Sequence, residues 1–223
     1  MGAEEKRRPG RPRTREKEAR LRRDEPIESL PPVARNLLNG ARRILEREGF
    51  GALSLSAIAA EADESKASIG YYFGNKDGLV VALVDSLVHE ANRGIIHDTH
   101  RYPMGEQRLR ALIDGERGII EDTRSFLTLL EVLPHALRDD SLRERIADLY
   151  AGYRKTILDV LDATEGPDEA RLRPYAVLMI AIVDGLSLQQ SLDPDGTDLS
   201  AAIDLWRRMT RCLLKELQLV DFA

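Results

Sequence analysis

The chain has 223 residues, 43% of them hydrophobic and 32% charged, so it can bury a substantial core beneath a highly charged surface. Its formal net charge of −5 is unevenly distributed, because residues 1–23 carry ten Lys and Arg against four Asp and Glu and the remainder is acidic. This distribution argues against a protein that coats nucleic acid over its whole surface, and the single cysteine, Cys212, excludes an intrachain disulfide framework.

The amino terminus is basic and no apolar stretch follows it, which predicts the absence of a secretory signal. The longest apolar run, Tyr175 to Val183, is much shorter than the ~18 residues of a membrane-spanning helix. We therefore expect a cytoplasmic protein without a membrane partner.

Residues 1–29 are rich in Arg, Lys, Glu and Pro and poor in apolar residues, which predicts an arm that is disordered until it binds. Residues 8–13, Arg-Pro-Gly-Arg-Pro-Arg, resemble an AT-hook, a segment that lies in the narrow minor groove of A·T-rich DNA. The alternative is a charged tail that binds phosphates without sequence preference, and both hypotheses predict binding that weakens steeply with salt. The candidate contacts are Arg8, Arg11 and Arg13.

The first helical pattern begins at Pro31 and places apolar side chains on one face. Ser29 is a candidate cap, and Gly49 and Gly51 would end the helix. Ser54 is expected to cap a short second helix.

The segment Ala62-Asp63-Glu64 would turn the chain into a third helix over about residues 65–71, and Asn75 would cap a long fourth helix. Four or five further helical patterns follow, near residues 105–122, 124–138, 140–163, 168–191 and 198–219. Pro134 and Pro174 lie inside these patterns and are expected to kink or end their helices. No segment favours a strand, so the prediction is an all-α chain of about nine helices.

The third predicted helix begins with Ser65-Lys66-Ala67-Ser68, a slim polar end that can enter the major groove of DNA while Ile69 and Phe73 pack inward. An alanine methyl group there can touch a thymine methyl group. Nearby polar side chains would contact phosphates and so set the register of the protein on the duplex. The candidate DNA contacts are Ser54, Ser65, Lys66, Ala67, Ser68, Tyr71, Tyr72 and Lys76.

Residues 33–79 resemble the amino-terminal domain of the TetR (tetracycline repressor) family of bacterial regulators. The matching residues are Ile44-Leu45, Gly49-Phe50, Leu53-Ser54-Leu55, Ile58-Ala59, Ser65-Lys66-Ala67-Ser68-Ile69, Tyr71-Tyr72-Phe73, Asn75-Lys76-Asp77 and Leu79. The resemblance implies a helix-turn-helix DNA-binding domain at residues 30–77 and a helical domain for ligand binding and dimerisation at residues 78–223. It assigns DNA contacts to the same polar residues.

Three positions depart from the family pattern. Asp63 replaces a usual glycine in the turn, and aspartate tolerates left-handed geometry better than most residues. Glu64 stands at a usually apolar position, which puts the local packing in question. Gly70 replaces a common tyrosine, so one expected contact is absent.

A helix that reads the major groove usually works in a two-fold dimer, so we expect a homodimer on a near-palindromic operator. The last two helical patterns carry apolar stripes that could form a four-helix interface, and an ordinary intramolecular core is the alternative. The candidate interface residues are Met179, Val183, Leu186, Trp206, Met209 and Leu213.

The middle helices could surround a pocket for an unknown small, partly apolar effector that releases the DNA. Each polar candidate has an alternative as a paired or surface side chain. The candidates are Arg117, Glu131, His135, Tyr150, Tyr153, Tyr175, Asp184 and Gln189.

Two other functions remain open. His97 and His100, with His89 earlier, could bind metal in a helical enzyme, although no His-Glu-x-x-His motif is present. A non-specific architectural DNA-binding protein is the second alternative. The preferred hypothesis is a ligand-released transcriptional repressor that is not an enzyme and needs no cofactor or metal.

Overall fold

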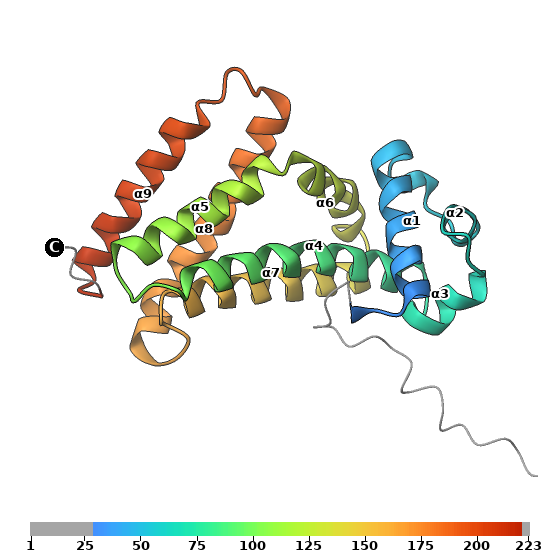
Figure 1. Ribbon diagram of the computed structural model, residues 1–223, viewed down its shortest axis with the longest axis horizontal. Helices are drawn as coiled ribbons and strands as arrows, with labels where there is room; N and C mark the ends of the chain where they lie inside the picture. The colour runs from blue at the N-terminus through green and yellow to red at the C-terminus, as the bar shows by residue number, and fades with distance from the viewer. Residues whose placement is uncertain (1–28, 220–223) are drawn as a thin grey trace, which may run out of the picture.

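The computed structural model describes residues 29–219 and contains only helices and their connections over that range, which confirms the all-α prediction (Figure 1). The predicted arm contacts Arg8, Arg11 and Arg13 lie outside the described residues. The elements in this range are α1 (Pro32–Glu48), the 3-10 helix η3 (Phe50–Ala52), α2 (Leu55–Glu61), α3 (Lys66–Phe73), α4 (Lys76–Thr99), α5 (Glu106–Glu121), α6 (Thr123–Ala136), α7 (Asp140–Val160), α8 (Gly166–Leu192) and α9 (Leu199–Glu216).

Side-chain caps begin α2, α3 and α4 where the sequence predicts them. The Ser54, Ser65 and Asn75 side chains each accept the backbone N–H of the residue three positions later, at 3.1, 3.1 and 2.7 Å. The predicted cap Ser29 is wrong, because α1 begins directly after Pro31 and has no side-chain cap. Proline in the first turn fixes φ for the helix and lacks an N–H, so it makes a polar cap less necessary there.

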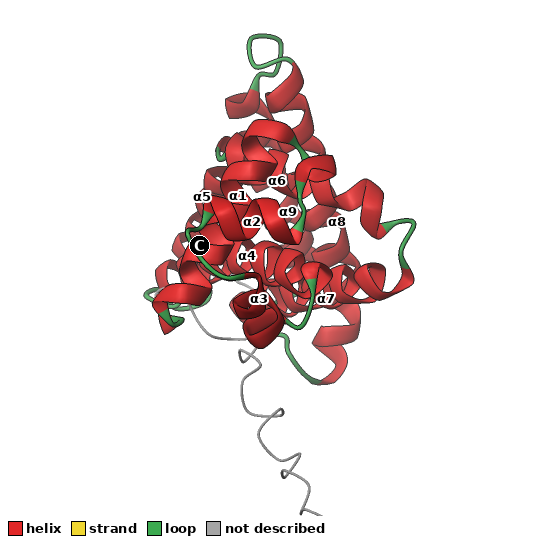
Figure 2. Ribbon diagram, turned by 90° about the vertical axis from the view of Figure 1, so that its right-hand side faces the viewer, coloured by secondary structure: helices red, strands yellow, loops and turns green. Residues whose placement is uncertain are grey.

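Helices α1, α2 and α3 pack into a small unit at one end of the molecule, hereafter the head (Figures 1 and 2). Its centre is formed by Leu38, Ile58 and Ile69, one from each helix, and none of them is more than 1% exposed. The apolar faces of three short helices therefore meet in one core, which fixes the direction in which α3 presents its other face.

The turn between α2 and α3 accommodates both unusual acidic residues. Asp63 has φ 53°, the left-handed conformation expected for the usual glycine. The Glu64 carboxylate accepts a hydrogen bond from the Asn36 side chain on α1 at 3.0 Å. The carboxylate at this usually apolar position is thus satisfied by a polar partner rather than by packing.

Helix α4 runs from the head into the larger bundle and contacts α1 and α3 at one end and α5 and α7 along its length (Figure 1). The bundle packs α5, α7, α8 and α9 around Leu112, Ile157 and Met179. Helix α6 lies between the head and the bundle, where Val132 and Ala136 join the core of the head. Movements of α4 or α6 would therefore reach the head directly.

Only one of the two internal prolines lies close to the end of its helix, since α6 ends two residues after Pro134. Helix α6 continues past Pro134 to Ala136, and α8 continues past Pro174 to Leu192. Among the described helices, α8 alone has the length and apolar composition of a possible membrane span. This was not predicted from the sequence, because the prediction considered only the uninterrupted apolar run from Tyr175 to Val183. However, Met179 lies fully buried within the bundle, so packing against the other helices accounts for part of this composition.

Candidate DNA-reading surface and ligand pocket

Helix α3 presents a slim exposed face at the end of the molecule remote from α9 (Figure 1). Lys66, Ala67, Gly70 and Tyr71 are all exposed, and Tyr71 is 61% exposed, whereas Ile69 is fully buried on the opposite side. A Cβ atom added at Gly70 would meet no other protein atom within 4 Å. Small side chains and one lysine on a short helix allow its backbone to approach a groove closely.

The side chains of the two serines at the start of α3 form a hydrogen bond with each other. The Ser65 and Ser68 hydroxyl oxygens lie 2.8 Å apart, and Ser68 is half-buried. Tyr72 is also half-buried, with its ring edge-on to Tyr71 at a centroid distance of 4.9 Å. Ser68 and Tyr72 therefore contribute to the internal structure of the head as well as to its surface.

Lys76, at the start of α4, is likewise engaged within the head. Its ammonium group donates a hydrogen bond to the Leu53 carbonyl oxygen at 3.1 Å and lies 4.7 Å from the centroid of the Phe50 ring. Ser54, the next residue after Leu53, is exposed at the amino terminus of α2. Lys76 thus joins the start of α4 to the start of α2, where free helix amides could meet a phosphate.

The head has no excess positive charge. Residues 30–77 contain six Lys and Arg and six Asp and Glu. Glu61 accepts hydrogen bonds from Arg43 at 2.7 Å and Arg47 at 3.0 Å, and these two contacts lower the pKa of Glu61. Part of its positive charge is therefore paired internally, and Lys66 and Lys76 are its two lysines.

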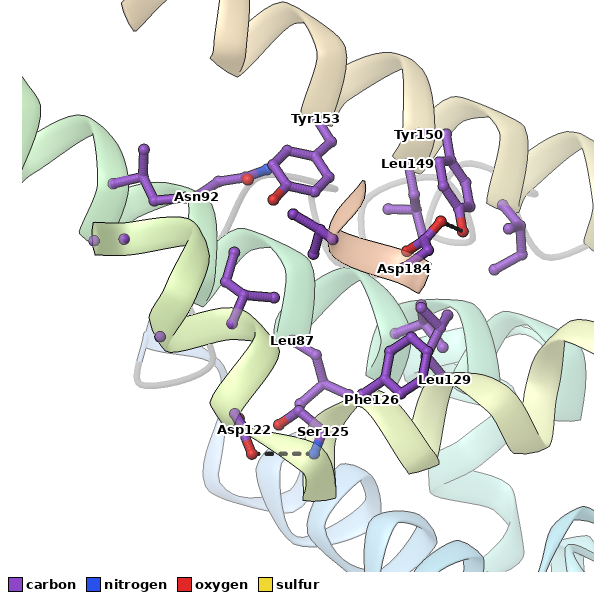
Figure 3. A pocket seen from close by; sticks show the side chains of 18 of the residues that line it. Leu87, Asn92, Asp122, Ser125, Phe126, Leu129, Leu149, Tyr150, Tyr153 and Asp184 are labelled. Carbon is purple, nitrogen blue, oxygen red and sulfur yellow. Dashed lines mark hydrogen bonds between the residues drawn. The ribbon is translucent and has the colours of Figure 1, made fainter. Parts of the chain in front are cut away.

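A cavity of about 460 Å³ lies among α4, α5, α6, α7 and α8, with one wall reaching Arg42 of α1 (Figure 3). Its wall is mainly aliphatic, with the aromatic rings of Phe126, Tyr150 and Tyr153. Gly94 and Gly118 also line it, and a Cβ atom at either would meet no other protein atom within 4 Å. Glycines on α4 and α5 therefore leave open space in the helix packing.

Asp184 supplies the carboxylate at the centre of the polar wall. It accepts a hydrogen bond from the Tyr150 hydroxyl at 3.0 Å (Figure 3), and burial raises the pKa of Asp184 against the opposing effect of that bond. Asn92, on α4, is buried at the cavity wall, and its side-chain oxygen has no hydrogen-bond partner among the described residues. A ligand with positive or hydrogen-bond-donating groups could pair with either acceptor.

A second carboxylate lies behind this wall. Glu116 of α5 is fully buried and accepts a hydrogen bond from the Tyr153 hydroxyl. Burial raises the pKa of Glu116 to about 7, and the Tyr153 bond lowers it in part. The sequence prediction missed Glu116, although it falls on the face of α5 that carries the buried residues Leu112 and Ile120, which is an unusual place for a carboxylate.

Three of the eight predicted ligand residues line the cavity: Tyr150, Tyr153 and Asp184. The other five do not. Arg117 pairs with Glu121 at 2.7 Å, Tyr175 shares a hydrogen bond with Thr210 at 2.8 Å inside the bundle, and Gln189 is exposed. Glu131 and His135 contact Phe50 of the head.

The predicted dimer residues divide in a similar way. Met179, Val183 and Trp206 are at most 4% exposed within a single chain, so they belong to the intramolecular core and the interface prediction is wrong for them in this structure. Leu186 and Leu213 are half-buried, and Met209 is 58% exposed. The exposed apolar stripe of α8 and α9 instead comprises Val177, Leu178, Ala181, Leu188, Leu205 and Met209.

The histidines do not form a metal site among the described residues, where no group of three potential metal ligands occurs. His97 lies 3.1 Å from Asp98, and His100 lies 3.6 Å from Asp159. The side chain of His89 lies outside the described residues.

Two family models match the chain. Residues 37–83 match the bacterial regulatory proteins of the tetR family, and residues 105–215 match the carboxy-terminal domain of BetI-type transcriptional repressors. The regulator BetI of Vibrio campbellii is 26% identical over 185 residues, which cover 79% of this chain and 90% of that protein. The nicotine-responsive repressor HdnoR of Paenarthrobacter nicotinovorans is 29% identical over 71% of this chain and 83% of that protein.

A solved structure has the same fold. It is a regulator from Saccharomonospora viridis in complex with choline, with a TM-score of 0.59, 20% identity, and coverage of 82% of this chain and 95% of that chain. The first family model covers the head and the start of α4, and the second covers most of the bundle. Neither match favours an architectural protein or a metal enzyme. The chain belongs to the TetR family and is a DNA-binding transcriptional regulator.

Proposed function

We propose that the protein is a homodimeric repressor that binds a near-palindromic operator through α3 and is released by a small organic cation in the cavity. The observation that carries this proposal is the separation of an exposed slim face on α3 from a cavity with an acidic and aromatic wall. The DNA contacts proposed on the head are Ser54, Ser65, Lys66, Ala67, Ser68, Tyr71, Tyr72 and Lys76. Arg8, Arg11 and Arg13 of the basic arm would add minor-groove or phosphate contacts.

The exposed stripe of α8 and α9 supports the dimer. Leu178 is 61% exposed and Met209 is 58% exposed, and each has another exposed apolar residue about one turn away on its own helix, Ala181 on α8 and Leu205 on α9. A contiguous exposed apolar patch of this kind often marks a surface that binds another protein. A two-fold contact there would place two copies of α3 so that they read inverted half-sites.

The dimer is tested by the mass of the particle in solution. Leu178→Asp would place two like charges near the two-fold contact and should convert the dimer to a monomer with much weaker operator binding. Leu137→Asp is the matched control, because Leu137 is 73% exposed on the connection after α6 and lies off the stripe. Dissociation by both variants, or by neither, would count against this interface.

The charge of the effector follows from the carboxylates that line the cavity. Asp122 caps α6 by accepting the Ser125 N–H at 3.2 Å, and Asp98 contacts His97. The Asp184 carboxylate accepts a hydrogen bond from the Tyr150 hydroxyl and shares the cavity wall with the rings of Tyr153 and Phe126. A half-buried carboxylate in a cavity that is also lined by aromatic rings favours a compact cation. The choline complex and the nicotine-responsive relative are consistent with ligands of this kind.

The first experiment is selection of bound fragments from a random DNA pool at moderate salt. An enriched inverted repeat is expected, and an unenriched pool would favour an architectural role. The effector is then tested by thermal unfolding with choline, other small amines, and the uncharged choline isostere 3,3-dimethylbutan-1-ol. Cations should stabilise the protein and dissociate the operator complex, whereas stabilisation by neutral compounds alone would exclude the cation.

Asp184→Asn should weaken cation binding by about tenfold or more, since the remaining groups cannot replace its charge. Asp98→Asn is the matched control, because it removes the same charge from the exposed rim of the cavity. The affinity for the cation should also fall as the pH is lowered through the raised pKa of Asp184.

A further inference from the structure

Phe50, in the turn between α1 and α2, is held by two residues of α6 that the sequence had suggested for the ligand pocket. The Glu131 carboxylate accepts the Phe50 backbone N–H at 3.0 Å. The His135 ring stacks on the Phe50 ring, with centroids 3.8 Å apart and planes at 17°. One residue of the head therefore receives both a hydrogen bond and a ring contact from the same helix.

Glycine at position 49 makes this arrangement possible. Gly49 has φ +78°, and a Cβ atom there would lie 3.0 Å from a carboxylate oxygen of Glu131. A larger residue would strain the backbone and push Glu131 away from the Phe50 N–H. The turn is thus shaped to admit the carboxylate.

The Phe50 ring is also contacted by Lys76. Its ammonium group lies 4.7 Å from the ring centroid and donates to the Leu53 carbonyl oxygen at 3.1 Å. Phe50 therefore lies where the end of α6, the start of α4 and the approach to α2 meet. The side chain is only 9% exposed, so movement of any of the three elements would disturb its packing.

The opposite end of α6 also contacts the head. Arg42 of α1 donates to the Ser125 hydroxyl at 3.1 Å, and both residues line the cavity. Phe126 and Leu129, between the two ends of α6, line the cavity as well. Helix α6 is consequently attached to the head at both ends, and its middle forms part of the ligand wall.

Given the dimeric repressor proposed above, we propose that Glu131 and His135 are positioning residues that fix the head on α6 and so determine which spacing of operator half-sites the dimer accepts. Two heads that are rigidly attached can meet successive major-groove surfaces at one spacing only. Heads that rotate on a loosened attachment accept several spacings, but they lose affinity because more freedom is lost on binding.

The experiment measures operator affinity while the central spacing of the selected inverted repeat is changed by one or two base pairs in either direction. The wild-type protein should prefer one spacing strongly. In the Glu131→Ala/His135→Ala double variant, affinity at the preferred spacing should fall by about tenfold and the preference among spacings should nearly disappear. Binding to random DNA should be unchanged, because none of the substituted side chains carries a proposed phosphate contact.

Two variants separate positioning from general stability. Glu131→Gln keeps an oxygen that can accept the Phe50 N–H, so it should retain most of the spacing preference. Leu137→Ala, two residues after His135 at the end of α6 and 73% exposed, should behave as the wild type. A double variant that is less stable but keeps the wild-type preference among spacings would overturn the positioning role.

The two proposals fail in different ways. A wild-type protein that selects no inverted repeat would refute the dimeric operator complex, and the spacing role with it. A wild-type protein with a sharp spacing preference that the double variant shares would leave the repressor intact and refute the role of Glu131 and His135.

Discussion

The head and the cavity offer their proposed partners surfaces of opposite construction. The proposed DNA-reading face comes from one helix of eight residues, α3, and its neighbouring turns, and its side chains are exposed. The cavity is assembled from six helices, with lining residues that extend from Arg42 to Asp184 in the sequence. A surface made by consecutive residues can be recognised as a motif, whereas a cavity exists only after distant helices have packed.

The largest effect that would test this separation is expected for Ile69→Ala. Ile69 is fully buried in the head, and removing such a side chain typically costs about 2–5 kcal/mol of stability. Operator binding should be lost, while stabilisation of the bundle by its effector persists. Both are measured by operator titration and by thermal unfolding with and without the effector.

Leu55→Ala is the control for this variant. Leu55 is 41% exposed in the same unit, so its replacement should lower the stability of the head only slightly. The core of the head continues into Ile146, which also lines the cavity. Loss of effector binding in Ile69→Ala would therefore show that the two regions fold as one unit.

Glu116→Gln should change the stability of the bundle by up to about 3 kcal/mol, in a pH-dependent manner. Burial raises the pKa of Glu116 to about 7, so the folded state holds a proton that the unfolded state releases at lower pH. The free energy of unfolding of the wild type should therefore fall as the pH rises from about 4.5 to 7. The glutamine variant remains neutral and should lack this decrease, which denaturant unfolding at several pH values would measure. Parallel curves for the two proteins would contradict a buried carboxyl with a raised pKa.

The local structure of the head could be predicted because each signal acts within a few residues. Ser54, Ser65 and Asn75 cap the predicted helices, and the left-handed turn falls at Asp63. The hydrogen bond between the Ser68 and Ser65 hydroxyls was not predicted, because the direction of a hydroxyl group depends on its neighbours in space.

The cavity and the exposed stripe could be predicted only in part. A polar residue in an apolar helix signals a functional site and a structural contact equally well, which is why Glu131 and His135 were expected in the cavity although they contact Phe50. Helix α8 has apolar residues around much of its circumference, so periodicity could not show that Met179 faces its own core while Leu178 faces outward.

Two lysines of the head should separate DNA contact from internal packing, with effects of about 1 kcal/mol on operator affinity. Lys66→Ala, on the exposed face of α3, should weaken binding to all sequences and reduce the salt slope by about one unit without lowering stability. Lys76→Ala should also destabilise the head, because it removes contacts to Leu53 and Phe50. Salt titrations and thermal unfolding of both variants distinguish the cases. Equal stability of the two would mean that the Lys76 contacts contribute little.

The smallest effects concern one helical glycine in each region. Gly70 on α3 and Gly118 on α5 both have open space where a Cβ atom would stand, so replacing either by alanine should raise stability by about 0.5–1 kcal/mol through helix propensity alone. Gly70→Ala adds a methyl group to the proposed groove-facing surface and should weaken operator binding only. Gly118→Ala adds one to the cavity wall and should weaken effector binding only. If both variants gain stability without losing affinity, neither glycine is needed for recognition, and the open space at both positions has no role in binding.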